Sequence, residues 1–548
     1  MLETTAKEDR LCPATLWRVT VECWLRCQGL IVIRQTEMCQ PLFQNLVSKL
    51  NWTHNHAASR SDIQSKIARM CTGSPLRVLD LFSGCGGFSL GFQAAGFRIV
   101  GNLEIDELAA QSHTRNFHGN APADIQAAHA KPRDITKTEP EDLARELGLE
   151  APVARAVDVI VGGPPCQAFA RVGRAKLRQV AEHPAAFRLD PRGNLYLRFL
   201  HYIRKFRPLA IVMENVPDVI NYGGHNIPEE TCELLEQHGY SARYTLLNSV
   251  FYGVPQMRER MFLIAIAAEL GPGVAFPKPT HWADLPVGYE GSRQVALKHL
   301  RLRLPETDAY YLDPPAPNPR LAPAVTAEEA LRDLPPINGH LNGTIRRGTR
   351  RFDQFLSYPR GVRLSNFAKE MRDWPGVRLE GGIWDHVIRC TPRDYPLFRK
   401  MRPGDQYPEA FQLALRLLDK KLAHAGTNEA SGAHTSPDYE HTRKATVPPY
   451  DPSKFPNKWR KMEPHMPART LMAHLGKDTY SHIHYDDSQA RMISVREAAR
   501  LQSFPDAFRF CGTMNPAFRQ IGNAVPPLLA RAVARCLKHQ LLHPHLQS

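Results

Sequence analysis

The chain has 548 residues, of which 43% are hydrophobic, and a formal net charge of +15. This length and composition exclude an intrinsically disordered chain and allow several domains. No apolar run approaches the roughly 18 residues that a membrane helix needs, and no signal peptide is evident, so a cytoplasmic protein without membrane partners is expected. The excess of Lys and Arg favours a polyanionic partner over a merely soluble basic surface.

Residues 1–70 are expected to form an N-terminal extension of unknown role. They are either a small helical extension or sequence upstream of a start at Met70. Their four cysteines include no CxxC pair, so no metal site is expected. The eleven cysteines of the whole chain are scattered, which indicates reduced thiols rather than a disulfide framework.

Residues 71–276 alternate apolar strands with helical patterns. The expected strands contain RVLDLF, RIVGNLEI, DVIVGG, LAIVMENV and RMFLIAI. Such alternation predicts an α/β fold with a parallel sheet, in which ligands bind at the carboxyl ends of the strands. Residues 277–466 lose the alternation and are rich in proline and arginine, so a second, loop-rich domain is expected there. The regular pattern returns within residues 467–548.

The first two expected strands end in residues that suit a nucleoside. The first runs into the glycine-rich turn DLFSGCGGFSLGF, which lets backbone amides approach a ligand, although a plain tight turn is the alternative. Glu104 ends the second strand, at the spacing after Gly84 where an acid binds ribose hydroxyls in such folds. Asp134, at a third strand end, is placed to address an adenine ring. Together these residues indicate a nucleoside-containing cofactor.

The next strand ends bring a thiol and an acid to the same edge. Cys166 follows the sharp turn Gly162-Gly163-Pro164-Pro165 and is either a nucleophile or a buried structural cysteine. Glu214 either caps the following helix or donates a proton, since burial raises the pKa of a carboxyl group. Arg258 and Arg260 alternate before the last strand, so they share a face that can hold a polar ring or a phosphate.

Two basic clusters in the loop-rich region favour nucleic acid as the partner. Residues 343–363 interleave arginines with aromatic residues, and KFPNKWRK places Trp459 among lysines and Arg460. Phosphate contact and recognition of base edges are not separable here, and any single member can be ordinary surface. The arginines of the first cluster are Arg346, Arg347, Arg350, Arg351, Arg360 and Arg363.

Between about residues 75 and 540 the chain carries, in order, DLFSGCGGFSLGF, Glu104, GGPPCQAF, DPRGNL, ENV, GVPQMRER, PARTLMAH and RQIGNAVPP. In this order the motifs resemble the DNA (cytosine-5)-methyltransferases of bacterial restriction–modification systems. The resemblance implies a Rossmann-like sheet of the S-adenosylmethionine-dependent methyltransferases in residues 71–276 and target recognition by residues 277–466. Residues 467–548 would return to the catalytic domain and complete the cofactor pocket.

The resemblance also implies a mechanism. The Cys166 thiolate would add to cytosine C6, so that C5 attacks the sulfonium methyl of S-adenosylmethionine. Glu214 would protonate or hydrogen-bond N3, and Arg260 would bind O2 with support from Arg258. Loss of the C5 proton would eliminate Cys166 and leave 5-methylcytosine. Because the reacting ring is stacked inside a duplex, base flipping is implied.

The cofactor and partners follow from the same resemblance. The expected partner is double-stranded DNA, the expected state is a monomer, and a cognate restriction endonuclease would act on the same site. The expected contacts with S-adenosylmethionine are Phe82, Gly84, Gly87, Glu104, Ile105, Asp134, Gly163, Pro165, Leu195, Asn523 and Val525.

Two rival interpretations stay open. One is a transfer-RNA cytosine-5 methyltransferase, which shares the catalytic motifs but carries a Cys-Phe-Thr tripeptide that this sequence lacks. The other is a catalytically silent DNA-binding protein, although Cys166 and Glu214 are both present.

Overall fold

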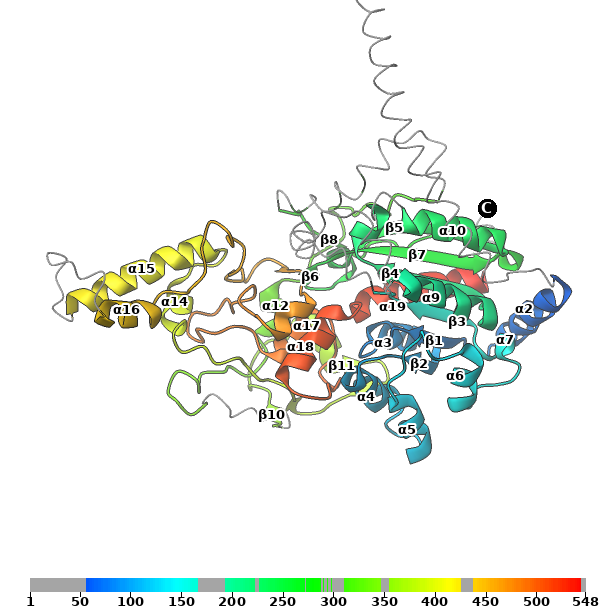
Figure 1. The fold of residues 1–548 in the computed structure, drawn as a ribbon, viewed down its shortest axis with the longest axis horizontal. Helices are drawn as coiled ribbons and strands as arrows, with labels where there is room; N and C mark the ends of the chain where they lie inside the picture. The colour runs from blue at the N-terminus through cyan, green and yellow to red at the C-terminus, as the bar shows by residue number, and fades with distance from the viewer. Residues whose placement is uncertain are drawn as a thin grey trace, which may run out of the picture. The chain divides into compact units, whose positions relative to one another are not determined.

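The computed structural model describes residues 56–165, 193–221, 226–271, 273–286, 289, 293, 297, 310–345, 354–424 and 437–543. Its centre is a six-stranded sheet in the order β2-β1-β3-β4-β7-β5 (Figure 1). The strands are β1 (Arg77–Leu81), β2 (Arg98–Leu103), β3 (Val159–Gly162), β4 (Ala210–Asn215), β5 (Tyr240–Asn248) and β7 (Glu259–Ala267). The expected α/β sheet is therefore present.

The sheet is mixed rather than wholly parallel. Strands β1 to β4 are parallel, as expected, but β7 runs antiparallel to both β4 and β5. The parallel direction expected for RMFLIAI is thus wrong, and the strand β5 is an addition. The short link from Asn248 to Glu259 explains the direction, because a parallel crossover needs a dozen or more residues.

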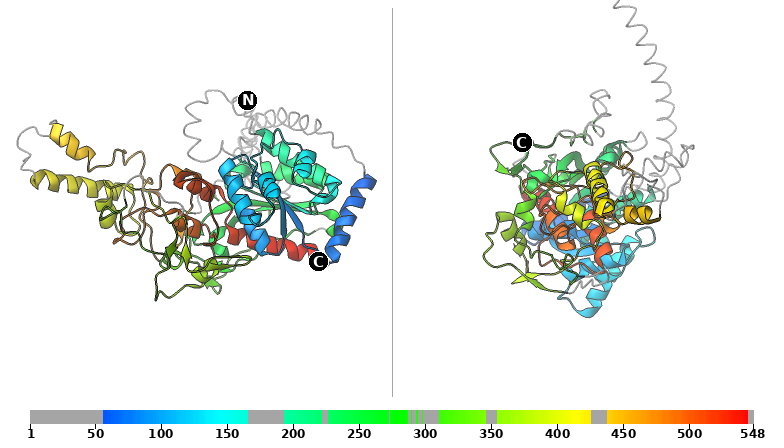
Figure 2. Two further views of the ribbon diagram at one scale, coloured as in Figure 1. Left: turned by 90° about the horizontal axis from the view of Figure 1, so that it is seen from below. Right: turned by 90° about the vertical axis from the view of Figure 1, so that its left-hand side faces the viewer.

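Helices cover both faces of the sheet. Helix α3 (Gly87–Ala94) packs against the C-terminal helix α19 (Pro527–Leu542), whereas α9 (Gly193–Phe206) packs with α6 (Pro140–Glu146) and α7 (Val153–Ala156). Figures 1 and 2 show α19 on one side of the strands and α9 on the other. The remaining helices around the sheet are α4 (Glu107–Phe117), α5 (Ala123–Ala130) and α10 (Ile227–Gln237).

Helix α2 (His56–Cys71) joins the sheet-containing unit. The Lys66 ammonium donates to the carbonyl oxygens of Phe206 and Arg207, each at 2.7 Å, and Met70 is buried. Residues from Ser59 onward belong to one compact unit. The boundary expected at residue 70 therefore falls inside a helix, because buried contacts tie that helix to the end of α9.

The region after β7 is poor in regular structure, as expected. It contains α12 (Ala327–Leu331), α13 (Asn366–Arg372), α14 (Tyr395–Lys400), α15 (Tyr407–His424) and α16 (Pro437–Lys444). Two-residue strands pair β8 (His281–Trp282) with β9 (Ala322–Pro323), β10 (Leu356–Ser357) with β13 (Gly382–Ile383), and β11 (Asp373–Trp374) with β12 (Val377–Arg378).

Helices α14 and α15 have a hydrophobic core of their own. Phe398 and Tyr407 pack there with Trp459, and the core continues to Ile483 and Met492. It therefore extends past residue 466, where we expected the second domain to end. Hydrophobic contacts across residues 397–492 keep this stretch together.

The two basic clusters differ in how far their side chains are exposed. Trp459 is fully buried and stacks on Tyr480 at 4.6 Å, and the Lys461 ammonium is buried against the Phe398 carbonyl at 2.7 Å. These two side chains belong to the core and are not available to nucleic acid. In the first cluster Arg360 is exposed, while Arg346, Arg347, Arg350 and Arg351 lie outside the described residues.

The return segment adds α17 (Val495–Leu501) and α18 (Met514–Asn523), together with buried ion pairs. Arg491 binds Glu497 through two hydrogen bonds of 2.7 Å. Arg500 binds Asp506 at 2.5 Å and Asp333 at 3.0 Å, and all three side chains are buried. Because Asp333 follows α12, this arginine ties the loop-rich region to the return segment.

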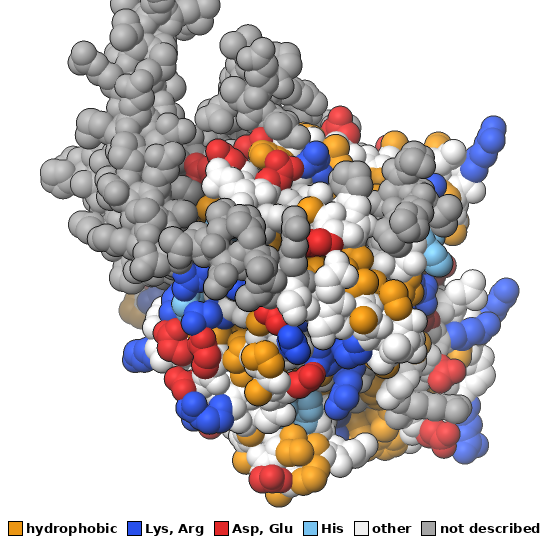
Figure 3. Space-filling view, turned by 90° about the vertical axis from the view of Figure 1, so that its right-hand side faces the viewer, with side chains coloured by type: hydrophobic (Ala, Val, Ile, Leu, Met, Phe, Trp, Pro, Cys, Tyr) orange, Lys and Arg blue, Asp and Glu red, His pale blue; other side chains and the backbone are white. Residues whose placement is uncertain are grey.

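The surface shows mixed charge on one face. Figure 3 shows acidic and basic side chains intermingled on the side seen from the right of Figure 1. The positive charge drawn there is thus not gathered into a single patch. Among the described residues, no helix is both long and apolar enough to cross a membrane.

The close contact of α3 with α19 generates a prediction for Gly91→Ala. An added Cβ would lie 2.5 Å from the Arg531 amide nitrogen and 2.7 Å from the Pro527 carbonyl oxygen. Helix propensity alone favours alanine by about 1 kcal/mol, but overpacking against backbone costs about 1–3 kcal/mol. We expect a lower midpoint of thermal unfolding. Gln93→Ala, two residues later in α3, serves as the control. A midpoint raised by Gly91→Ala would contradict overpacking of α3 against α19.

Candidate active site

The carboxyl ends of four strands bring most of the expected site residues to one edge of the sheet. Leu81 at the end of β1 lies opposite Leu103 of β2 and Gly162 of β3, and Gly162 lies opposite Met213 of β4. The glycine-rich turn, Glu104, the Gly163–Pro165 turn and Glu214 follow directly. The parallel arrangement of β1 to β4 is therefore what assembles the site.

The glycine-rich turn is held by Glu104. The Glu104 carboxylate accepts hydrogen bonds from the amides of Gly84 and Asp106, both at 2.8 Å. Gly84 and Gly86 have φ angles of +52° and +104°, and Phe82 adopts +59°, which a side chain rarely tolerates. Burial raises the pKa of Glu104. The turn is thus a constrained structure built around a buried acid.

The other expected cofactor residues surround this turn. An added Cβ on Gly87 would meet the Val525 carbonyl oxygen at 2.2 Å, so the end of α18 lies directly against the turn. Asn523 closes that helix and is exposed. The Ile105 side chain is 66% exposed, which is unusual for isoleucine and suits an apolar ligand surface.

Asp134 and Leu195 reach the same neighbourhood by different routes. The Arg133 amide donates to the Glu104 carbonyl at 2.7 Å, which sets Asp134 beside the end of β2. The expectation that Asp134 ends a strand is wrong, because the chain after α5 runs into a turn at residues 135–137 and forms no strand there. The Asp134 carboxylate accepts from the amide and hydroxyl of Thr136, and the hydroxyl lowers the pKa of Asp134. On α9, Arg198 donates to the Ile135 carbonyl at 2.8 Å, and Leu195 lies one helical turn earlier on that face.

A buried acid and a guanidinium form the centre of the edge. Arg260 Nε lies 3.1 Å from Glu214 Oε1, so Glu214 faces β7 rather than capping the next helical turn. Burial raises the pKa of Glu214, and the positive charges of Arg260 and Arg258 oppose that rise. A carboxyl group in this setting can hold a proton and donate it.

The Gly163–Pro165 turn lies against this acid. An added Cβ on Gly163 would be 3.3 Å from Glu214 Oε2, and Nδ2 of the Asn215 side chain donates to the Pro164 carbonyl at 2.8 Å. Cys166, the next residue after Pro165, lies outside the described residues. The turn that leads into it is nevertheless anchored beside Glu214.

Arg258 does not share the position of Arg260. Its Nη1 donates to the carbonyl oxygens of Leu471 at 2.8 Å and Gly522 at 3.1 Å, and the residue is 2% exposed. Burial lowers the pKa of Arg258 to about 9. The side chain holds the return segment in place, so the two arginines have different partners although they alternate in sequence.

Two further residues at this edge escape sequence reasoning. Gln256 in β6 (Gln256–Met257) donates to the Leu501 carbonyl at 3.1 Å and accepts from the Leu471 amide at 2.8 Å. The Tyr289 hydroxyl lies 3.1 Å from Thr470 Oγ1, which donates to the Met257 carbonyl at 2.7 Å. Burial raises the pKa of Tyr289 to about 12. Only the GVPQ and PARTLMAH motifs point to this contact, and no pattern marks Tyr289.

Strand β14 (Ala468–Arg469) carries the other half of this contact. It pairs with β6 in parallel, and the Ala468 amide donates to the Pro255 carbonyl at 2.9 Å. The PARTLMAH motif therefore packs against GVPQMRER. As a result, the return segment reaches the edge at β6 as well as at the glycine-rich turn.

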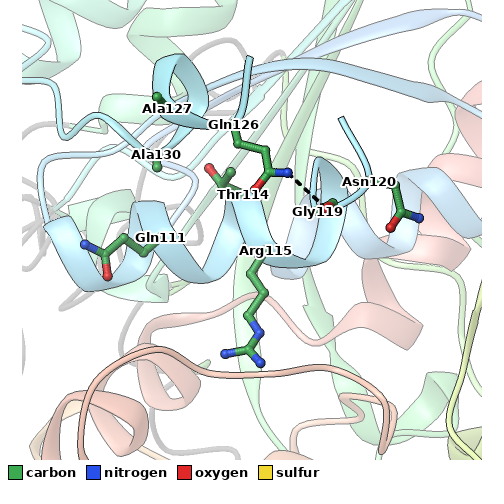
Figure 4. Close-up of a pocket in the computed structure, with 8 residues that line it drawn as sticks. All are labelled: Gln111, Thr114, Arg115, Gly119, Asn120, Gln126, Ala127 and Ala130. Carbon is green, nitrogen blue, oxygen red and sulfur yellow. Dashed lines mark hydrogen bonds between the residues drawn. The ribbon is translucent and has the colours of Figure 1, made fainter. Parts of the chain in front are cut away.

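A separate hollow lies between α4 and α5 and holds none of the expected site residues. Figure 4 shows Gln126 from α5 reaching toward the end of α4, where its amide donates to the Gly119 carbonyl at 3.1 Å. The described residues contain no group of three His, Cys, Asp or Glu side chains placed to hold a metal.

The fold and the edge together define a methyltransferase-like α/β protein. The model of the family "C-5 cytosine-specific DNA methylase" matches residues 76–315 and 395–539. The chain therefore belongs to this family, and it is an enzyme of the DNA (cytosine-5)-methyltransferase class.

Similar proteins agree with this assignment. M.OihORF3336P of Oceanobacillus iheyensis, named as a type II methyltransferase, is 39% identical over 85% of this chain and 95% of its own length. Type II methyltransferase M.AgeI of Thalassovita gelatinovora is 29% identical over 84% of this chain and 99% of its own. A crystal structure of a DNA modification methyltransferase from an E. coli prophage covers 85% of this chain and 99% of its own, with a TM-score of 0.51 and 21% identity, and supports the fold.

The Tyr289 contact generates a prediction for Tyr289→Phe, which keeps the ring and removes the hydroxyl. One neutral hydrogen bond contributes about 0.5–1.5 kcal/mol, so kcat for methyl transfer is expected to fall about twofold to tenfold. The KM for the methyl donor should stay unchanged, because Tyr289 contacts none of the expected cofactor residues.

Tyr310→Phe is the matched control, since the Tyr310 hydroxyl donates to Glu236 at 2.9 Å on the surface of α10. Steady-state kinetics and thermal unfolding would be measured on both variants. A Tyr289→Phe enzyme that melts earlier but keeps the wild-type kcat would assign this tyrosine to stability alone.

Proposed function

We propose that the enzyme transfers a methyl group from S-adenosylmethionine to C5 of a cytosine within one short sequence of duplex DNA. The observation that carries the proposal is the ion pair of the buried Glu214 with the half-buried Arg260, beside the turn that leads into Cys166. The names of the similar type II methyltransferases support a role in protecting DNA from a cognate restriction endonuclease.

The residues around the glycine-rich turn fit a nucleoside cofactor. Glu104 keeps free lone pairs beside its two amide partners and can accept from ribose hydroxyls, and the exposed Ile105 offers an apolar face for an adenine ring. Asp134 and Leu195 flank this face, and the end of α18 closes the turn. When bound, S-adenosylmethionine supplies an electrophilic methyl group. The close contact of Gly87 with Val525 suits a site that both chain segments build.

The reaction itself would use the thiol and the acid. A bond forms between Cys166 Sγ and cytosine C6 as Glu214 gives a proton or a hydrogen bond to N3. The electron pair at C5 would then bond to the methyl carbon, and the bond from that carbon to the sulfonium sulfur would break, so that the donor leaves as a neutral thioether. A base would remove the C5 proton, and the Cys166–C6 bond would break to restore the thiolate. A proton held on N3 would return to Glu214 as 5-methylcytosine leaves.

The two arginines would divide the remaining tasks. Arg260 would bind the base O2 while it holds the Glu214 carboxylate in place. Arg258 would act as a positioning residue through the carbonyls of Leu471 and Gly522. Because the target atoms are inaccessible in a stacked duplex, the cytosine would flip out to reach this edge. Residues 277–466 would recognise the sequence, and the enzyme would act as a monomer.

Mapping of 5-methylcytosine at base resolution tests this proposal. Random-sequence duplex DNA would be incubated with S-adenosylmethionine and either the wild-type protein or Cys166→Ala. We expect methylation in one sequence context with the wild-type protein and none with the variant, because alanine cannot form the bond to C6. Methylation that persists in Cys166→Ala would exclude this nucleophile. Unmethylated DNA together with methylation of RNA in a parallel incubation would favour the transfer-RNA alternative.

The role of Glu214 predicts a change in both rate and pH dependence. Glu214→Gln cannot give up a proton, so kcat is expected to fall about 10²- to 10⁴-fold. Since burial raises the pKa of Glu214, the wild-type kcat should decline as pH rises through that pKa, where the acid loses its proton. The variant should lack this alkaline decline. Glu236→Gln on α10 is the control, and an unchanged pH profile in Glu214→Gln would argue against proton donation.

A further inference from the structure

A hollow lined by cations and aromatic rings lies on helices α15 and α16, apart from the proposed active site. Its walls include Arg393, Phe411, Arg443, Lys444 and Tyr450. Figures 1 and 2 show α15 and α16 at the end of the described fold opposite the strands of the sheet. The helix α15 packs into the separate core around Tyr407 and Trp459. The hollow is thus outside the catalytic edge.

Hydrogen bonds from the buried core and from α15 fix the wall of the hollow. The buried Tyr407 hydroxyl donates to the carbonyl oxygen of Tyr450 at 2.8 Å. The Lys421 ammonium donates to Thr446 Oγ1 at 2.9 Å, which ties α15 to the end of α16. These contacts hold the segment after α16 in one shape. The side chains on this wall therefore extend from a backbone that these hydrogen bonds hold in place.

Only one of the three cations that line the hollow pairs with a carboxylate of the described residues. Arg393 pairs with Asp394 at 2.6 Å, and that carboxylate also accepts from the Tyr480 hydroxyl. Arg443 and Lys444 are exposed, and no carboxylate of the described residues pairs with either. Asp451, the acid on the rim, accepts instead from the amide and hydroxyl of Ser453 at 2.9 and 2.7 Å. Two cations thus remain for an external anion.

We propose that this hollow binds a backbone phosphate of the DNA duplex, outside the bases that surround the methylated cytosine. Adjacent Arg and Lys side chains gain affinity for phosphate by releasing the counterions of DNA. The rings of Phe411 and Tyr450 supply apolar contact with sugars. The inference rests on the proposed function, because it takes duplex DNA as the substrate. It adds an anchor that holds flanking DNA without reading its sequence.

Salt-dependent binding tests the anchor. The double variant Arg443→Gln with Lys444→Gln would be compared with Arg416→Gln with Lys420→Gln, which alters two exposed cations on α15 away from the hollow. Each protein would bind a short duplex that just covers the methylated sequence and a long duplex with flanks on both sides. The slope of log K against log salt is negative, and each lost phosphate contact reduces its magnitude by about 0.9.

For the long duplex, we expect the hollow variant to reduce the magnitude of this slope by about 0.9, the value for one phosphate, relative to the wild type and the control. For the short duplex, we expect equal slopes in all three proteins. Equal slopes on the long duplex would overturn the proposal, and an equal loss on both duplexes would place the contact inside the target site instead. Methylation of the short duplex by each protein reports separately on the proposed function.

Discussion

Two buried side chains next to β7, Gln256 and Arg258, hold main-chain groups of the C-terminal segment against the edge of the sheet that carries the candidate site. The rest of the site depends on this attachment, because α18 must reach the glycine-rich turn from the far end of the chain. A buried arginine without such partners would be strongly destabilising. Its two carbonyl partners offset part of that cost, and removing the guanidinium would leave both carbonyls unsatisfied.

The buried ion pairs of α17 extend the same attachment to the loop-rich region. Arg500 lies between Asp506 of the return segment and Asp333 after α12, and Arg372 of α13 binds Asp333 at 2.6 Å. Such pairs contribute little net stability over an apolar core, but breaking one leaves an uncompensated charge. They therefore define a single arrangement of these segments. The region proposed to contact DNA and the edge proposed to perform the chemistry are thus linked through hydrogen bonds of fixed direction.

Sequence reasoning predicted the strands β1, β2, β3, β4 and β7 and the acids Glu104 and Glu214 at two of their ends, because apolar runs and turn residues are local signals. It missed β5 and the antiparallel direction of β7, which depend on the short link between them. It also did not find the contact of Tyr289 with Thr470, 181 positions later in the sequence, or that of Gln256 with Leu471, 215 positions later. The family motifs placed Asn523 and Val525 near the turn, a relation that no local pattern contains.

The bond between Glu104 and the Gly84 amide has a consequence for the order of events. The acid holds the strained turn from within the protein, so the turn takes its shape from contacts that the chain itself supplies. The conformational entropy of that turn is accordingly lost when the protein folds and not when a cofactor binds. A cofactor that meets such a turn can bind without waiting for DNA. The enzyme would then encounter its duplex with the methyl donor in place.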